Sequence, residues 1–160
     1  MSLLNRFFHK KTLEIGAPVK GKIVPIAEVN DPMFAQEMIG RGVAIIPEEG
    51  KYYAPCDGHL SVLFPSGHAY ALKNRDGVDV IIHIGIDTVK LNGKNFTIYA
   101  KQGQDVNKGD LIIEVDLEAV KAAGFDMITP MVISNPGIFG NLEKRDGEVA
   151  VGDAAILLTK

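Results

Sequence analysis

The sequence predicts an all-β protein, an antiparallel β-sandwich or barrel-like fold with one or two short helices. Short runs rich in β-branched residues recur along most of the chain, and its 17 glycines and 8 prolines lie mostly between them. Such spacing of strands and turn residues is typical of a sandwich or barrel. The clearest predicted strands are residues 19–24, 52–54, 59–64, 111–115, 131–134 and 155–158.

One helix is expected over residues 117–123, with Asp116 as its N-cap and Gly124 as its end. A shorter helical turn is expected over residues 31–38. Residues 1–16 are expected to form a mobile N-terminal arm that precedes a single β-sandwich domain of residues 17–160. A helix over residues 1–12 would gather apolar side chains on one face beside positive charges. That pattern suits either weak contact with an anionic membrane or a frayed terminus.

Composition excludes several classes of protein. With 46% hydrophobic and 23% charged residues in 160, the chain has the balance of an ordinary soluble domain. Its formal net charge of −3 argues against a general nucleic-acid binder, whose binding surface would be basic. The single cysteine, Cys56, cannot form an internal disulfide, which fits a reducing cytoplasm. We therefore expect a cytoplasmic protein.

The stretch over residues 79–88 carries the most information about function. It is expected to be one continuous strand, because β-branched residues dominate it and its pattern has a period of two. Its core face would hold Val80, Ile82, Ile84 and Ile86. The other face would hold His83, Gly85 and Asp87. Glycine within a strand often marks a close approach by another group, so this face is expected to be open around His83.

The preceding segment, residues 66–72, is expected to pair with that strand through a hairpin at Asp76-Gly77. A four-residue loop would place His68 directly opposite His83, and a two-residue loop would place them diagonally. Both registers keep the imidazoles on one face with Cβ atoms about 5 to 8 Å apart. A three-residue loop would put them on opposite faces unless a bulge intervened.

Two facing histidines suit three kinds of chemistry. The first is phosphoryl transfer, with one imidazole as nucleophile and the other as stabiliser. The second is a metal site with Asp87 as third ligand, and the third is general acid–base catalysis. A surface pair without a role is the remaining alternative. The sequence has no Walker-type phosphate loop and no dinucleotide-binding glycine motif.

Residues 80–93 closely resemble the phosphohistidine signature of the glucose-family IIA proteins of the bacterial phosphotransferase system. The family's second histidine is matched by Gly67-His68-Ala69, with His68 fifteen residues before His83. Further matches follow in family order over nearly the whole chain, at residues 17–21, 31–35, 54–58, 103–106 and 129–135.

The resemblance implies a phosphocarrier that needs no cofactor. His83 would accept a phosphoryl group from the phosphohistidine of the carrier protein HPr and pass it to a cysteine on the IIB domain of a glucose-type permease. His68 would stabilise the phosphoryl group, Ser66 would orient His68, and Asp87 would tune the charge. Many family members have threonine in place of Ser66. The resemblance also implies a conditional Zn²⁺ site in which a partner shares the metal with His68 and His83.

A regulatory binding module is the second interpretation. The same face would dock metabolic enzymes or transporters, with the phosphate as a switch. Exposed apolar residues often mark such interfaces. The candidates for an apolar rim are Met33, Phe34, Ile39, Phe64, Ile81 and Val89, and core packing is the alternative for several of them. The sugar is not encoded in this chain, because specificity lies in the permease.

Overall fold

The structure is a computed structural model, and it describes residues 11–160. Residues 1–10, which hold most of the expected arm, lie outside the described residues. The strands are β1 Thr12–Gly16, β2 Gly21–Pro25, β3 Arg41–Pro47, β4 Lys51–Tyr53, β5 Gly58–Leu63, β6 Ala69–Lys73, β7 Val78–His83, β8 Phe96–Ile98, β9 Asp105–Val106, β10 Leu111–Val115, β11 Thr129–Pro136, β12 Asn141–Lys144, β13 Gly147–Val149 and β14 Ala154–Thr159. The helices are η1 Ile26–Glu28, α2 Pro32–Ala35, η2 Thr88–Leu91 and α3 Leu117–Ala122.

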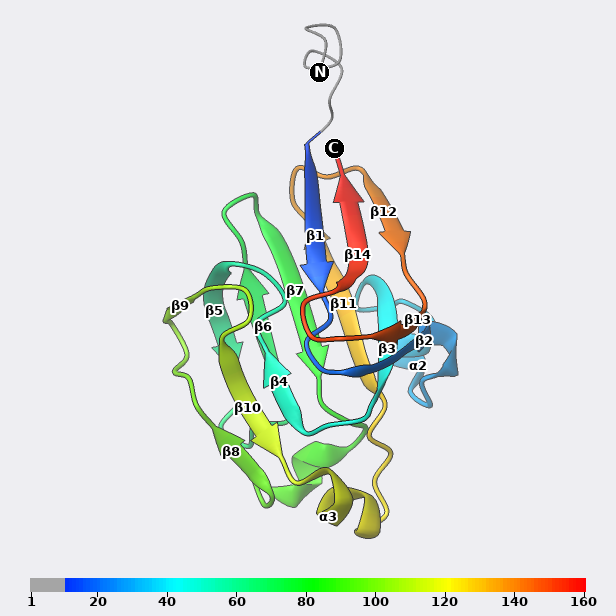
Figure 1. Ribbon diagram of the computed structural model, residues 1–160, viewed down its shortest axis with the longest axis vertical. Coiled ribbons are helices and arrows are strands. Elements are labelled where there is room, and N and C mark those ends of the chain that lie inside the picture. Colours follow the sequence, from blue (N-terminus) through cyan, green and yellow to red (C-terminus); the bar gives the residue numbers. More distant parts are fainter. Residues whose placement is uncertain (1–10) are drawn as a thin grey trace, which may run out of the picture.

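The strands form antiparallel sheets, as the sequence predicted. One sheet has eight strands in the order β13-β2-β3-β11-β7-β6-β5-β9. Two three-stranded sheets have the orders β1-β14-β12 and β4-β10-β8. In Figure 1, β1, β12 and β14 lie at the same end of the molecule as the C-terminus, and α3 lies at the other end. The all-β fold class with short helices is thus confirmed.

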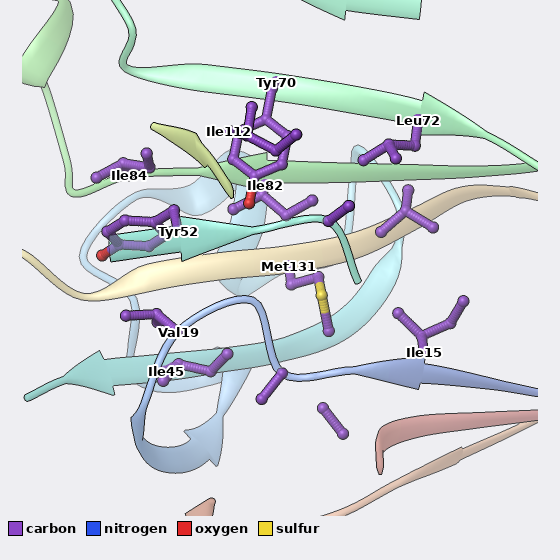
Figure 2. Close-up of a cluster of buried hydrophobic side chains, with 14 of the residues drawn as sticks. Ile15, Val19, Ile45, Tyr52, Tyr70, Leu72, Ile82, Ile84, Ile112 and Met131 are labelled. Carbon is purple, nitrogen blue, oxygen red and sulfur yellow. The ribbon is translucent and has the colours of Figure 1, made fainter. Parts of the chain in front are cut away.

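The main core lies between the sheets. Its largest fully buried side chains include Tyr52, Tyr70, Ile82, Ile112 and Met131, which come from five different strands. Figure 2 shows these side chains pointing toward one another between the ribbons. A second, smaller apolar cluster brings α2 and the segment after β7 together, and it comprises Val24, Ile26, Val29, Phe34, Ala44, Ile86, Ile128 and Val132. This second cluster fixes the surroundings of His83, because α2 and the segment after β7 both flank that residue.

Most expected elements are present with small shifts at their ends. The six strands named from the sequence overlap β2, β4, β5, β10, β11 and β14. The Asp116 carboxylate accepts a hydrogen bond from the Ala119 amide, which makes Asp116 the N-cap of α3. Asp31 caps α2 in the same way through the Met33 amide, so the second expected helix is also present but shorter. Short polar side chains at the N-cap satisfy amides that the helix leaves unpaired.

The arm expected through residue 16 ends earlier than the sequence indicated. Residues 12–16 form β1, which pairs with β14 over Thr12↔Thr159 to Ile15↔Ile156. The Ile15 side chain is fully buried in the main core. The strand was missed because its five residues are stabilised by a partner at the opposite end of the chain, which no local pattern reveals.

If β1 is part of the core, Ile15→Ala should lower the free energy of unfolding by about 2–5 kcal/mol, the usual effect of truncating a buried isoleucine. Thr12→Ala, at an exposed position of the same strand, is the control and should change it by less than about 0.5 kcal/mol. Urea unfolding of both variants measures the difference. Equal stability of the two variants would mean that β1 contributes nothing to the core.

Candidate functional site

β7 ends at His83, five residues before the end expected from the sequence. The chain leaves the strand because Gly85 has φ +74° and Asp87 has φ +61°, both in the left-handed region. Ile84 and Ile86 are buried as expected, but Ile86 belongs to the second cluster and not to the main core. The single strand over residues 79–88 is therefore wrong beyond His83. The alternation of buried residues nevertheless continues past His83, because Ile84 is buried in the main core and Ile86 in the second cluster.

Gly85 does not lie on an open strand face. A Cβ atom there would lie 2.7 Å from Thr88 Cγ2 and 3.0 Å from the Asp126 carbonyl oxygen. The close approach that the glycine indicated is real, but the approaching groups belong to this chain. Both the positive φ and the crowded space require glycine at this position.

The register of the β6–β7 hairpin differs from all three registers considered from the sequence. Lys73 pairs with Asp79, which leaves residues 74–78 between the paired positions, and Ala69 is the residue opposite His83. The Asn74 carboxamide oxygen accepts hydrogen bonds from the Asp76 and Val78 amides and so determines the loop length. A side chain that satisfies two loop amides can outweigh the Asp-Gly turn signal.

His68 nevertheless lies beside His83, because it precedes β6 and does not follow the alternation of that strand. Its carbonyl accepts a hydrogen bond of 2.7 Å from the Ile84 amide, which ties the two histidine segments together. The ring centroids of His68 and His83 are 5.2 Å apart, and the rings are nearly perpendicular at 71°. Phe64 packs beside His68 at 4.8 Å and Phe34 beside His83 at 5.3 Å.

Each imidazole has its Nδ1 atom engaged. His83 Nδ1 donates to the Gly85 carbonyl oxygen at 2.6 Å, so the proton of the neutral ring is on Nδ1 and the lone pair is on Nε2. His68 Nδ1 is hydrogen-bonded to the Ser66 hydroxyl, in the contact expected from the family resemblance. When that hydroxyl donates, the neutral His68 ring carries its proton on Nε2. One ring then presents a nucleophile and the other a hydrogen-bond donor.

Burial keeps both rings neutral near pH 7. Desolvation lowers the pKa of His83, although the Gly85 carbonyl and the carboxylates of Asp31 and Asp87 oppose that shift. Desolvation also lowers the pKa of His68, and the nearby His83 ring lowers it further. A neutral imidazole has the free lone pair that nucleophilic attack requires.

The expected three-ligand metal site is not formed. Asp87 stands at the N-cap of η2 in a left-handed conformation, is exposed, and acts on His83 only through its charge. Within residues 11–160 no group of three His, Cys, Asp or Glu side chains is placed to hold a metal ion. Asp31, whose charge acts on His83 in the same direction, was missed because the sequence shows it only as a helix cap.

The expected apolar rim is partly exposed. Met33, Phe64 and Val89 are 46%, 45% and 48% exposed, and Ile39 and Ile81 are half-buried. Phe34 is buried, because it belongs to the second cluster, yet its ring touches His83. Met38 is the most exposed large apolar side chain among the described residues and was missed; it lies three residues after the end of α2.

His83 is half-buried, and His68 is buried with 7% of its surface exposed. Five surface cavities of about 230 to 520 Å³ are lined by other residues. In the part of the chain that the structure describes, no helix has the length and apolar character needed to span a bilayer. A neutral imidazole with a free lone pair beside exposed apolar side chains is the arrangement that suits a group-transfer protein.

Residues 13–138 match the family described as phosphoenolpyruvate-dependent sugar phosphotransferase system, EIIA 1, and the chain belongs to this family. It is 41% identical over 157 residues to the "PTS system glucose-specific EIIA component" of Buchnera aphidicola. The aligned residues cover 98% of each chain. It is 38% identical over 165 residues to the protein of the same name from Haemophilus influenzae, which covers 100% of this chain and 99% of the relative.

Two further similarities extend the comparison. A "PTS system beta-glucoside-specific EIIBCA component" of Halalkalibacterium halodurans is 40% identical over 148 residues, which are 92% of this chain but 23% of that longer protein. The solved structure of the glucose permease IIA from Mycoplasma capricolum superimposes with a TM-score of 0.86 at 34% identity, over 98% of this chain and 99% of that one. Proteins of this family act through a phosphohistidine between HPr and a IIB domain, and this chain is such a phosphotransferase component.

The lowered pKa of His68 gives a testable dependence of stability on pH. The unfolded chain takes up a proton near the ordinary pKa of 6.5, whereas the folded protein does so only at lower pH. The group therefore stabilises the fold above the unfolded pKa, and this contribution is lost as pH falls through the folded pKa. Between about pH 7.5 and about pH 5, the melting temperature of His68→Gln should fall less than that of the unchanged protein. Parallel curves for the two proteins would show that His68 has no such effect.

Proposed function

We propose that the Nε2 atom of His83 is the phosphoryl acceptor of this carrier in the cytoplasm. The observation that supports this best is the 2.6 Å hydrogen bond from His83 Nδ1 to the Gly85 carbonyl, because it leaves the lone pair on Nε2. The P–N bond of phospho-HPr breaks as the bond from phosphorus to Nε2 forms, and the donor imidazole keeps the released electron pair. In the second transfer, a IIB cysteine thiolate takes the phosphoryl group and His83 becomes neutral again.

His68 is proposed to stabilise the phosphoryl oxygens during both transfers. Its ring centroid lies 5.2 Å from that of His83, so a donor on its Nε2 atom is close to a group carried by His83. In this role the Ser66 hydroxyl donates to His68 Nδ1 and so holds the tautomer that has this donor, as the outer partners of ligands do elsewhere. In-line phosphoryl transfer depends mainly on such positioning and charge stabilisation.

The rim of Met33, Phe64 and Val89 is proposed to dock HPr and the IIB domain in turn. Apolar side chains around a nucleophile exclude water, which protects the phosphohistidine from hydrolysis during transfer. The relatives named as glucose-specific support a glucose-type permease as the acceptor. The same surface would serve a regulatory role, since a phosphate on His83 adds negative charge to an apolar docking site.

Phosphorylation with phospho-HPr tests the assignment. His83→Gln should take up no phosphate, because glutamine offers no nucleophilic nitrogen. His68→Gln should accept phosphate on His83 but pass it to the IIB domain at least about tenfold more slowly, since it lacks the ring that stabilises the transferring group. Radiolabelled phosphate followed by peptide mapping measures both steps.

His59→Gln, at an exposed histidine hydrogen-bonded to Asp105, is the control and should behave as the unchanged protein. Stoichiometric labelling of His83→Gln would refute His83 as acceptor. Normal onward transfer by His68→Gln would remove His68 from the mechanism.

We also propose that His68 and His83 can bind Zn²⁺ at a site shared with a partner protein. Zinc requires the other tautomer of His68, in which Nδ1–H donates to the Ser66 hydroxyl and the Nε2 lone pair is free. The chain then offers two Nε2 atoms, which are half of a tetrahedral ligand set. A carboxylate of a docked protein and water would complete it. Calorimetry with Zn²⁺ should show weak binding to the free protein and none to His68→Gln or to the phosphorylated protein, since phosphorylation consumes Nε2 of His83. Tight binding that survives both changes would place the metal elsewhere.

A further inference from the structure

The five residues after β7, 84–88, form a loop that is fixed at three points. The Ile84 amide donates to the His68 carbonyl at 2.7 Å, and the Ile86 amide donates to the Asp126 carbonyl at 2.8 Å. The Thr88 hydroxyl donates back to the Ile84 carbonyl at 2.5 Å, which closes the loop on itself. The Gly85 carbonyl, which receives the His83 proton, lies between these anchors.

Thr88 is a fully buried polar side chain with no role in the proposed transfer. Its hydroxyl is used by the Ile84 carbonyl, and its methyl group fills the space beside Gly85, 2.7 Å from where a Cβ atom would lie. Both halves of the side chain therefore act on the same loop. Any buried threonine needs a hydrogen-bond partner for its hydroxyl. Here that partner is the Ile84 carbonyl, which belongs to the residue directly after His83.

The loop also packs against a second anchored segment, residues 126–129. The Asp126 carboxylate accepts from the Ile128 amide at 3.0 Å, and the Met127 carbonyl accepts from the Thr129 hydroxyl at 3.0 Å. That hydroxyl is in turn hydrogen-bonded to the buried Tyr52 hydroxyl at 2.8 Å. The Asp126 carbonyl, which holds the Ile86 amide, is thus part of a segment tied to the main core.

We propose that Thr88 is a positioning residue for the phosphoryl transfer, because its hydroxyl holds loop 84–88 in the conformation that turns the Gly85 carbonyl toward His83 Nδ1. The inference rests on the proposed role of His83. A neutral histidine without a fixed partner populates both tautomers, and only the form with its proton on Nδ1 has a free lone pair on Nε2. Loosening the loop lowers the fraction of molecules with the productive tautomer and turns the ring away from the reacting geometry.

Thr88→Val and Thr88→Ser separate the two halves of the side chain. Valine keeps the methyl packing beside Gly85 and removes the hydroxyl, whereas serine keeps the hydroxyl and removes the methyl. For Thr88→Val we expect the ¹⁵N chemical shifts of His83 to move toward a mixture of tautomers. The rate of phosphorylation by phospho-HPr should fall about tenfold or more, as expected for a misplaced reacting group. Thr88→Ser should keep the tautomer and most of the rate.

Ile156→Val is the control for lost stability, because Ile156 is fully buried in β14, a strand that pairs with β1 and β12 in a different sheet from β7. It should lower the melting temperature but leave the tautomer and the rate unchanged. Thr88→Cys, whose thiol is a weak donor, is the second variant if Thr88→Val does not fold, and its tautomer shift should lie between those of the serine and valine variants.

An unchanged His83 tautomer and rate in folded Thr88→Val or Thr88→Cys would overturn the proposal. So would a loss of rate in Thr88→Ser equal to that in Thr88→Val, because the packing and not the hydroxyl would then matter. The tautomer is read in the unphosphorylated protein, whereas the proposed function fails if the unchanged protein takes no phosphate on His83. The two failures are therefore distinguishable.

Discussion

The hydrogen bond from His83 Nδ1 to the Gly85 carbonyl is the interaction on which the rest of the site depends. A histidine can reach the carbonyl two residues ahead only if the chain turns at once, so β7 must end at His83 and Gly85 must adopt a positive φ. That turn brings Gly85 against Thr88 and the Asp126 backbone, where no larger side chain fits. The glycine is required by the position of the proton on His83 and by the packing behind it.

The end of β7 also explains how the second histidine reaches the first. In a continuous ladder, the observed register would place His68 on the face opposite to His83, since Ala69 is the residue paired with His83. Both histidines stand where the ladder stops, and the bond from the Ile84 amide to the His68 carbonyl holds their backbones together. The two rings can then meet across a strand end, with Phe34 and Phe64 outside them.

The sequence predicted the fold class and both histidines, but not the geometry that relates them. Val80 and Ile82 gave a correct strand, yet Ile84 and Ile86 extended the same alternation into a loop, because burial in a second cluster looks identical to burial in the first. The hairpin register was wrong because Asn74 caps a longer loop than the Asp-Gly signal suggests. Strand β1 was missed because its partner β14 is distant in sequence. Thr88 gave no signal, since a buried threonine after a strand is ordinary in a β protein.

The proposed transfer places two opposing requirements on the two histidines, and the surrounding residues bear on both. A nucleophile must stay neutral, and burial of the rings against Phe34 and Phe64 lowers the pKa of each histidine. A phosphoryl group is strongly charged and needs donors, yet the same burial supplies few of them. An uncharged His68 ring can provide one donor without repelling HPr or the IIB domain by a fixed charge. Such a site binds the phosphoryl group less strongly than a site with arginine side chains would. Weaker binding suits a carrier, because the carrier must release the phosphoryl group to the next protein.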